Sequence, residues 1–117
     1  MTAESHADAL TVRRLLVSIV KYALLDTEAI TPDLEQSARQ TQAELRARHG
    51  GAVPPSVHLN AQWELAVEEA EADQRLNHSG VSLTLPQMLP FDVALLMASP
   101  LDLNQLRDRV RGAAATG

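Results

Sequence analysis

The chain has 117 residues, with 15 acidic against 10 basic side chains, no cysteine and 3% aromatic residues. This length supports one small domain over residues 1–117, and the 45% apolar fraction excludes a disordered chain. No apolar run reaches the length of a membrane span, and disulfides and thiolate metal sites are excluded. We expect flexible ends at residues 1–6 and 112–117. The basic residues inside the first apolar block exclude a secretory signal, so the cytoplasm is the expected location.

Charge is unevenly distributed along the chain. Residues 51–80 carry five acids and one base, whereas residues 1–50 are almost balanced and residues 81–117 are neutral. No segment has the basic excess that neutralising a phosphate backbone requires, so nucleic acid is not an expected partner. Nine of the ten basic residues are arginine, and this composition is typical of a GC-rich bacterial genome.

The first apolar segment, residues 7–25, has the periodicity of an α-helix. Its apolar side chains cover well over half of the helix circumference, and Leu10, Val17 and Leu24 form a second stripe beside the main one. A helix on the protein surface needs only one apolar side. This helix is therefore expected either to lie at the centre of the domain or to meet another chain.

Thr31 and Pro32 mark the start of a second helix, as an N-cap and a first-turn proline. The helix should end near His49, because the glycine pair at 50–51 supplies the left-handed backbone that closes helices. We expect a packing helix that faces mainly solvent, because its apolar stripe is limited to Leu34, Ala38 and Leu45.

Residues 59–76 predict a helix with two apolar stripes on opposite sides, separated by charged strips. The first stripe contains Trp63, which is expected in the core. The second stripe consists of Leu65, Ala72 and Leu76. Because two opposed stripes need two partners, we expect the second to meet another subunit or the C-terminal segment of the same chain.

Residues 81–85 alternate strictly between apolar and polar side chains, and Pro86 ends the run, which predicts one short strand. A strand needs a partner strand, and the candidate within the same chain is the stretch at 52–59, which prolines interrupt. Pairing with the same strand of another chain is therefore a second possibility. Residues 91–98 predict a short buried helix. The signals for a last helix are a cap, a first-turn proline and a capping acid, at Ser99, Pro100 and Asp102.

A search for catalytic and metal-binding patterns finds none. The four histidines are far apart, and none has the spacing that places two ligands on one side of a helix. Glu64 and Glu68 are one turn apart, but the surrounding charges indicate a solvated surface instead of an acid–base pair. The sequence has no glycine-rich nucleotide loop and no turn that would present a nucleophilic serine. We therefore expect no enzyme activity, no cofactor, no metal and no small-molecule substrate.

The order of strand, helix and helix over residues 81–112 supports a different hypothesis. The run Val-Ser-Leu-Thr-Leu-Pro at 81–86, followed by the Ser99 cap, resembles the ribbon-helix-helix family of bacterial DNA-binding dimers and antitoxins. In that family the strand pairs across the dimer and places its outward side chains in the major groove. The resemblance implies that Ser82 and Thr84 would contact DNA. Binding would then be salt-sensitive and would depend on Arg107, Arg109 and Arg111.

The sequence thus predicts an all-α domain, a small bundle of four to five helices with one short extended segment near 81–85. We expect a non-enzymatic bacterial interaction or regulatory protein, such as an adaptor, a chaperone or a complex subunit, that acts through apolar helix faces as a homodimer. The alternative is the DNA-binding or antitoxin function implied by residues 81–112. The expected protein interface consists of Leu65, Ala72, Leu76, Val81, Leu83 and Leu85.

Overall fold

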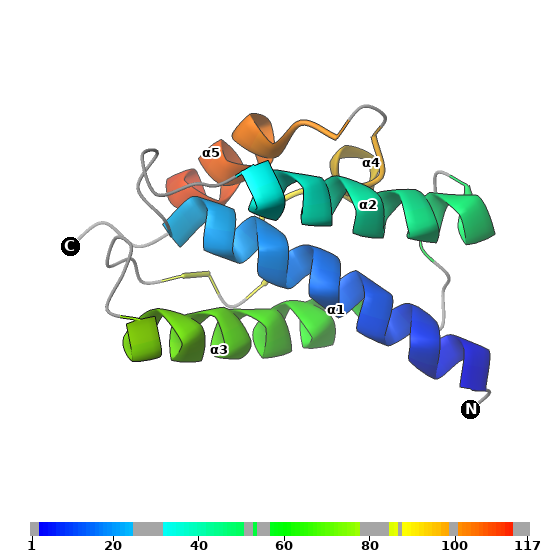
Figure 1. Cartoon of the computed structure of the whole chain (residues 1–117), viewed down its shortest axis with the longest axis horizontal. Coiled ribbons are helices and arrows are strands. Elements are labelled where there is room, and N and C mark those ends of the chain that lie inside the picture. Colours follow the sequence, from blue (N-terminus) through cyan, green and yellow to red (C-terminus); the bar gives the residue numbers. More distant parts are fainter. Residues whose placement is uncertain are drawn as a thin grey trace.

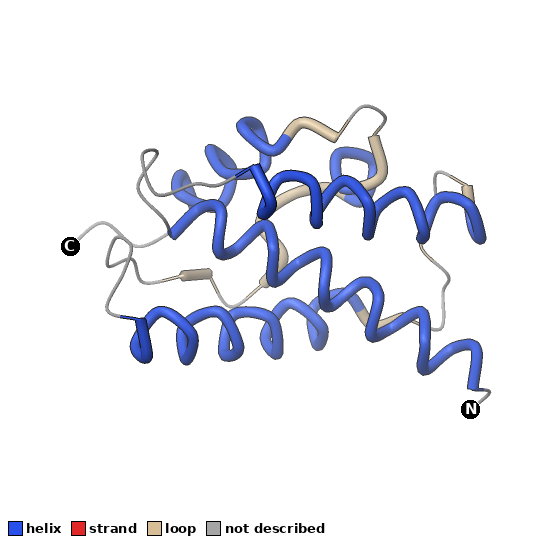
Figure 2. Tube along the Cα trace, in the orientation of Figure 1, coloured by secondary structure: helices blue, strands red, loops and turns tan. Residues whose placement is uncertain are grey.

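The computed structural model of the chain describes residues 3–24, 32–50, 53, 57–77, 85–86, 88–98 and 101–113. All regular secondary structure in these ranges is helical (Figure 2), which confirms the predicted all-α class. The helices are α1 (Ala3–Leu24), α2 (Pro32–His49), α3 (Leu59–Asn77), α4 (Val93–Leu96) and α5 (Leu103–Ala113).

α1 is the central helix of the domain. It runs diagonally between α2 and α3 in Figure 1 and packs against α2, α3 and α5. Every side chain of residues 15–20 is buried, and so is Leu24. The central position therefore explains the wide apolar circumference. Within the second stripe predicted for this helix, Leu10 stays 40% exposed, whereas Val17 is buried.

α2 begins at Pro32 and ends at His49, as predicted. Gly50 follows with φ of 70°, and its N–H donates to the carbonyl of Arg46 at 2.7 Å, so this glycine closes the helix. The expectation that α2 faces mainly solvent is only partly right. The polar side chains of Thr41 and Gln42 are buried in addition to its apolar ones.

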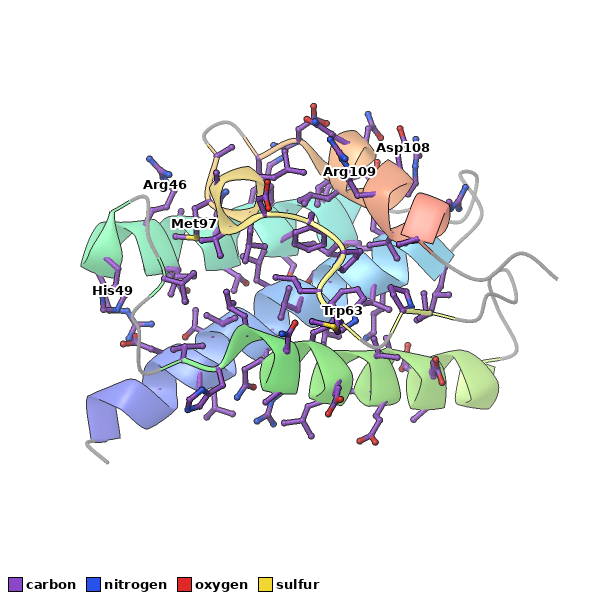
Figure 3. All side chains as sticks on the ribbon, turned by 180° about the vertical axis from the view of Figure 1, so that it is seen from behind. Arg46, His49, Trp63, Met97, Asp108 and Arg109 are labelled. Atoms are coloured by element: carbon purple, nitrogen blue, oxygen red, sulfur yellow. The ribbon has the colours of Figure 1, made fainter. Side chains whose placement is uncertain are left out.

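Polar side chains of α2 hold the backbone at and after α4. Gln42 Nε2 donates to the carbonyl oxygens of Leu96 and Ala98, at 2.8 and 2.7 Å. α4 is only one turn long, so its last carbonyls have no partner within a longer helix. Two arginines of α2 make similar bonds to carbonyls, Arg39 to Leu101 and Arg46 to Met97. Figure 3 labels Arg46 and Met97. Polar side chains of α2 thus supply hydrogen bonds to carbonyls that have no partner in regular secondary structure.

The first stripe of α3 lies in the core, as predicted. Trp63 is fully buried, its Nε1 donates to the carbonyl of Pro86 at 2.9 Å, and its ring meets that of Phe91 edge-on at 6.1 Å between centroids. Asn60 Oδ1 accepts a hydrogen bond from the N–H of Leu89 at 3.0 Å. These contacts hold the segment before α4 along α3, as the position of Trp63 in Figure 3 shows.

The short extended segment expected near 81–85 is not confirmed. Leu85 and Pro86 have no regular secondary structure, and residues 81–84 lie outside the described part of the chain. The short helix predicted over residues 91–98 is present as α4, which covers only Val93–Leu96 and contains the buried Leu96.

The last helix begins later than predicted. Leu101 and Asp102 are not helical, and α5 starts at Leu103. The Oδ1 atom of Asp102 accepts a hydrogen bond from the N–H of Gln105 at 3.0 Å, so Asp102 is itself the N-cap. Ser99 and Pro100, the predicted cap and first-turn proline, lie outside the described residues.

Candidate interaction surface

The outward side of α3 carries a line of small and apolar side chains with one acidic residue among them. Ala61, Leu65, Glu68 and Ala72 project within about 60° of one another, because successive helix positions are about 100° apart. We call these four residues the α3 seam. Leu65 is 40% exposed, Ala61 and Glu68 are exposed and Ala72 is half-buried. The seam lies opposite Trp63, so the core of the chain does not cover it.

The residues of the predicted interface fall into two groups. Leu65 and Ala72 lie two turns apart on one side of α3, as the sequence pattern predicts. Leu85, in contrast, is half-buried and packs against the core of its own chain. Three further positions lie outside the described part of the molecule, namely Val81, Leu83 and the side chain of Leu76. The structure thus brings Leu65 and Ala72 together and places Leu85 elsewhere.

α1 carries a second line of residues on one side, of which Leu10 and Arg14 are exposed, Lys21 is half-buried and Val17 is buried. Leu10, Arg14, Val17 and Lys21 also project within about 60° of one another, and we call them the α1 seam. Leu10 is 40% exposed, and Arg14 reaches into solvent with 64% of its side chain exposed. The sequence pattern predicts a second apolar stripe with Leu10 and Val17 on this helix, but it does not group them with Arg14 and Lys21.

The two seams carry opposite charge. Glu64 and Glu69 flank the α3 seam and are exposed, and Glu68 lies within it. The α1 seam contributes Arg14 and Lys21, which form ion pairs within the chain. Arg14 Nη2 is 3.4 Å from an oxygen of Glu44, and Lys21 Nζ is 3.5 Å from one of Asp73. Both pairs are largely exposed to solvent, where ion pairs are weak and exchange readily.

A buried carboxylate that the sequence analysis missed joins the beginning of α1 to the end of α2. Asp8 is 2% exposed, with its Oδ2 atom 2.9 Å from His49 Nε2 and its Oδ1 atom 3.1 Å from Arg48 Nη1. Oδ1 accepts no hydrogen bond of good geometry, so Arg48 acts on it mainly through charge. Arg48 also donates to the Thr11 hydroxyl at 3.0 Å, and that hydroxyl donates to the carbonyl of Ala7. The cluster joins the two helix ends.

Tyr22, the one tyrosine of the sequence, is buried where α1 meets α5. Its hydroxyl donates to Asn104 Oδ1 at 2.8 Å, and the guanidinium of Arg107 lies 5.7 Å from the ring centroid. Burial raises the pKa of Tyr22 above its ordinary value, and the charge of Glu35 and a hydrogen bond with it add to the rise. Arg107 and Arg39 lower this pKa. The phenol therefore remains protonated at neutral pH.

Two open hollows adjoin each other beside α4 and share Leu95, Ala98 and Gln105 in their walls. The hollow that includes Tyr22 has a volume of about 560 Å³, and the one that includes Arg109 has about 390 Å³. These volumes are in the range of small-ligand sites. However, several polar groups that line the larger hollow already bind within the chain, since Tyr22 donates to Asn104 and Arg39 to the carbonyl of Leu101.

The arginines implied in DNA binding have different roles in the structure. Arg107 stacks on Tyr22, and Arg111 Nε donates to the carbonyl of Ala23 at the end of α1, at 2.9 Å. Arg109 is exposed on the outer side of α5 (Figure 3). Two of the three arginines thus stabilise the fold. The proposed DNA-reading residues Ser82 and Thr84 lie outside the described residues, so that alternative stays a prediction.

The described ranges contain no candidate metal site and no candidate membrane span. There, no three histidine or acidic side chains come together in a way that could hold a metal ion. None of the helices in those ranges is long and apolar enough to cross a membrane.

Comparisons of the chain with protein-family models, with curated proteins and with solved structures give no match. Similarity therefore assigns neither a family nor an activity. The observations that bear on function are those of the molecule itself, above all the exposure of Leu65 in the α3 seam and of Leu10 in the α1 seam.

Proposed function

We propose that this chain is a non-enzymatic interaction protein that binds a protein partner, in the first place a second copy of itself, through the α3 seam. The observation that carries the proposal is the 40% exposure of Leu65 on a helix whose opposite side already completes the core. A single exposed leucine is common on protein surfaces. Leu65, however, stands in line with Ala61 and Ala72, whose small side chains allow another helix to approach closely.

The size of this side of the molecule supports the proposal. A stable dimer of ordinary size buries about 800 Å² on each partner. The molecule measures 39 by 26 by 24 Å, and α1 and α3 cross its broadest side (Figure 1). Burial of a few hundred Å² of apolar surface contributes several kcal/mol at about 25 cal/mol per Å², before ordering and association costs are subtracted. The seams can therefore hold two copies together.

In the cell such a protein would act as an adaptor, a small chaperone or a subunit of a larger complex. Its acidic charge and lack of cysteine suit a bacterial cytoplasmic protein. The same composition is unfavourable for a primary role in phosphate binding, because a DNA-binding surface needs several unpaired basic side chains.

Light scattering over a wide dilution series tests the proposal. The wild-type chain should show a stable mass near twice 12.7 kDa, and Leu65→Asp should reduce the mass to that of the monomer while circular dichroism shows unchanged helicity. Met88→Asp is the matched control, because Met88 is 66% exposed and lies outside both seams. A wild-type monomer at every concentration, or a Leu65→Asp chain that still dimerises, contradicts the proposal.

A further inference from the structure

We infer that the α3 seam binds the α1 seam of a second copy, packed antiparallel in a two-fold symmetric dimer. This inference rests on the proposed function, because it names the surface that the α3 seam would meet. It assigns to Leu10 and Arg14 a role that the fold of a single chain does not require.

The two seams have the same residue spacing in either direction, and the antiparallel alignment is the one that places Arg14 opposite Glu68. Along α1 the steps between seam residues are four, three and four positions, and the steps backwards along α3 are the same. Aligned in this way, an apolar residue meets an apolar residue on either side of a central pair of opposite charges, Arg14 and Glu68. The aligned apolar pairs are Leu10 with Ala72 and Val17 with Leu65. This is the repeat by which antiparallel helices pack side chains into one another.

Side-chain size matches in the same alignment. Leu10 is a large exposed side chain, and it would meet the small Ala72. Leu65 is the large exposed side chain of the other helix, and it would lie over Val17, which is 8% exposed and belongs to the core of its own chain. The contact of Leu10 with Ala72 thus combines a projecting side chain with a small one, as close packing of two helices requires, and Leu65 would rest against the partner's core at Val17.

Charge distinguishes this arrangement from the two simpler ones. Packing α3 against its own copy would bring Glu64, Glu68 and Glu69 close to the same acids of the partner, and like charges at short range are unfavourable. Packing α1 against its copy would oppose two Arg14 side chains. Packing α1 against α3 converts both repulsions into attractions. Arg14 can leave its exposed intrachain contact with Glu44 at little cost.

The relative placement of α1 and α3 permits the two-fold arrangement. Arg13 Nε donates to Gln62 Oε1 at 2.9 Å near the start of α3, and Lys21 pairs with Asp73 near its end, so the two helices run in the same direction. The turns of α1 before Arg13 consequently extend past the start of α3 (Figure 1). A two-fold axis that passes between α1 and α3 would lay residues 61–72 of each α3 along residues 10–21 of the α1 of the other copy. Each contact would then occur twice.

Charge reversal tests the inference. Arg14→Glu and Glu68→Arg, each alone, place two like-charged contacts in the dimer, and each should raise its dissociation constant about tenfold. An equimolar mixture of the two variants should form heterodimers with nearly wild-type affinity, because both contacts are again attractive. Native mass spectrometry resolves the heterodimer from the two homodimers by mass, and sedimentation gives the affinities.

The matched controls change the same charges elsewhere. Arg109→Glu and Asp108→Arg lie on the outer side of α5 (Figure 3) and should leave dimerisation unchanged. Glu44→Gln removes the intrachain partner of Arg14 and should not weaken the dimer. Circular dichroism checks that each variant keeps its helices.

The possible failures can be told apart. If the wild-type chain dimerises and Leu65→Asp abolishes the dimer, but the reversed charges neither weaken the dimer nor restore it on mixing, then the α1 seam is not the partner surface. In that case the inference is wrong and the proposed function stands. If the wild-type chain is a monomer at every concentration, both are overturned.

Discussion

α2 and α3 lie on two sides of α1, yet they are held there by different kinds of contact (Figure 1). α3 buries an apolar stripe that contains Trp63 and Ala66. α2 buries Leu45 beside the polar Thr41 and Gln42, and its side chains donate hydrogen bonds to backbone carbonyls of the segment around α4. A helix can therefore be fixed in a small core by satisfying irregular backbone as well as by burying apolar area.

The two kinds of contact should fail in different ways. The free energy from apolar packing falls with the volume that is removed, so it responds to side-chain size. A buried polar contact responds to the loss of one partner, because the other is left without a hydrogen bond. Substitutions on α2 and α3 can separate the two kinds of contact.

Trp63→Ala should have the largest effect. The change removes the largest buried side chain and leaves the carbonyl of Pro86 without its donor, so the free energy of unfolding should fall by about 3–5 kcal/mol. Urea unfolding followed by circular dichroism measures the loss. Trp63→Phe keeps an aromatic ring near Phe91 and should lose less. Equal losses for the two variants would show that packing volume is not the cause.

Gln42→Ala tests the polar side of α2. The carbonyls of Leu96 and Ala98 would lose their donor in a buried place, and the loss of stability should be about 2–3 kcal/mol. Hydrogen exchange should also quicken at the amides of α4. Gln40→Ala is the matched control, since Gln40 is exposed on the same helix and should change stability by less than about 0.5 kcal/mol. Similar losses in both variants would contradict the structure.

Asp8→Asn should destabilise the junction of α1 and α2 somewhat less. Loss of the buried charge leaves Arg48 without its counter-ion and His49 without its carboxylate partner. Both are partly exposed, so the cost should be about 2 kcal/mol instead of the larger value for a fully buried pair. Thermal unfolding measures it. Glu44→Gln breaks an exposed ion pair between the same helices and should cost much less.

The smallest effect should be a loss of stability at alkaline pH, caused by Tyr22, which lies near the start of α2. The pKa of Tyr22 is raised in the folded chain by burial and then by Glu35, so the contribution of the neutral phenol is complete below the unfolded pKa, near 10. Stability should then decrease as the pH rises through the folded pKa. Ultraviolet absorbance of the one tyrosine follows its ionisation directly. Tyr22→Phe should remove this part of the pH dependence, and an unchanged profile would contradict the assignment.

Much of the fold could be predicted from sequence because its helices carry local signals. The first-turn Pro32 and the left-handed Gly50 bound α2 as predicted, and the apolar period of α3 places Trp63 in the core. The buried polar contacts could not be predicted in the same way. Gln42 binds carbonyls more than fifty residues away, and no local pattern distinguishes it from the exposed Gln40.

The candidate interaction surface was predicted in part for the same reason. Periodicity identified Leu65 and Ala72 on the far side of α3, because residues that share one side of a helix are fixed by their spacing. Leu85 was assigned to the same surface, but it packs against its own core, which depends on the path of the chain after α3. Leu10 became visible as exposed only once α2 and α3 were seen to cover the rest of α1.

The central position of α1 has a consequence for how substitutions combine. α2, α3 and α5 each pack against α1 and have few contacts with one another. Energetic effects of substitutions add when the sites share no partners and couple when they do. Leu16→Ala in α1 should therefore show coupling with core substitutions in each of the other three helices, whereas Leu45→Ala in α2 and Val110→Ala in α5 should combine almost additively. Substitutions in α2, α3 and α5 would then be tolerated independently of one another, whereas each substitution in α1 would change which substitutions those three helices tolerate.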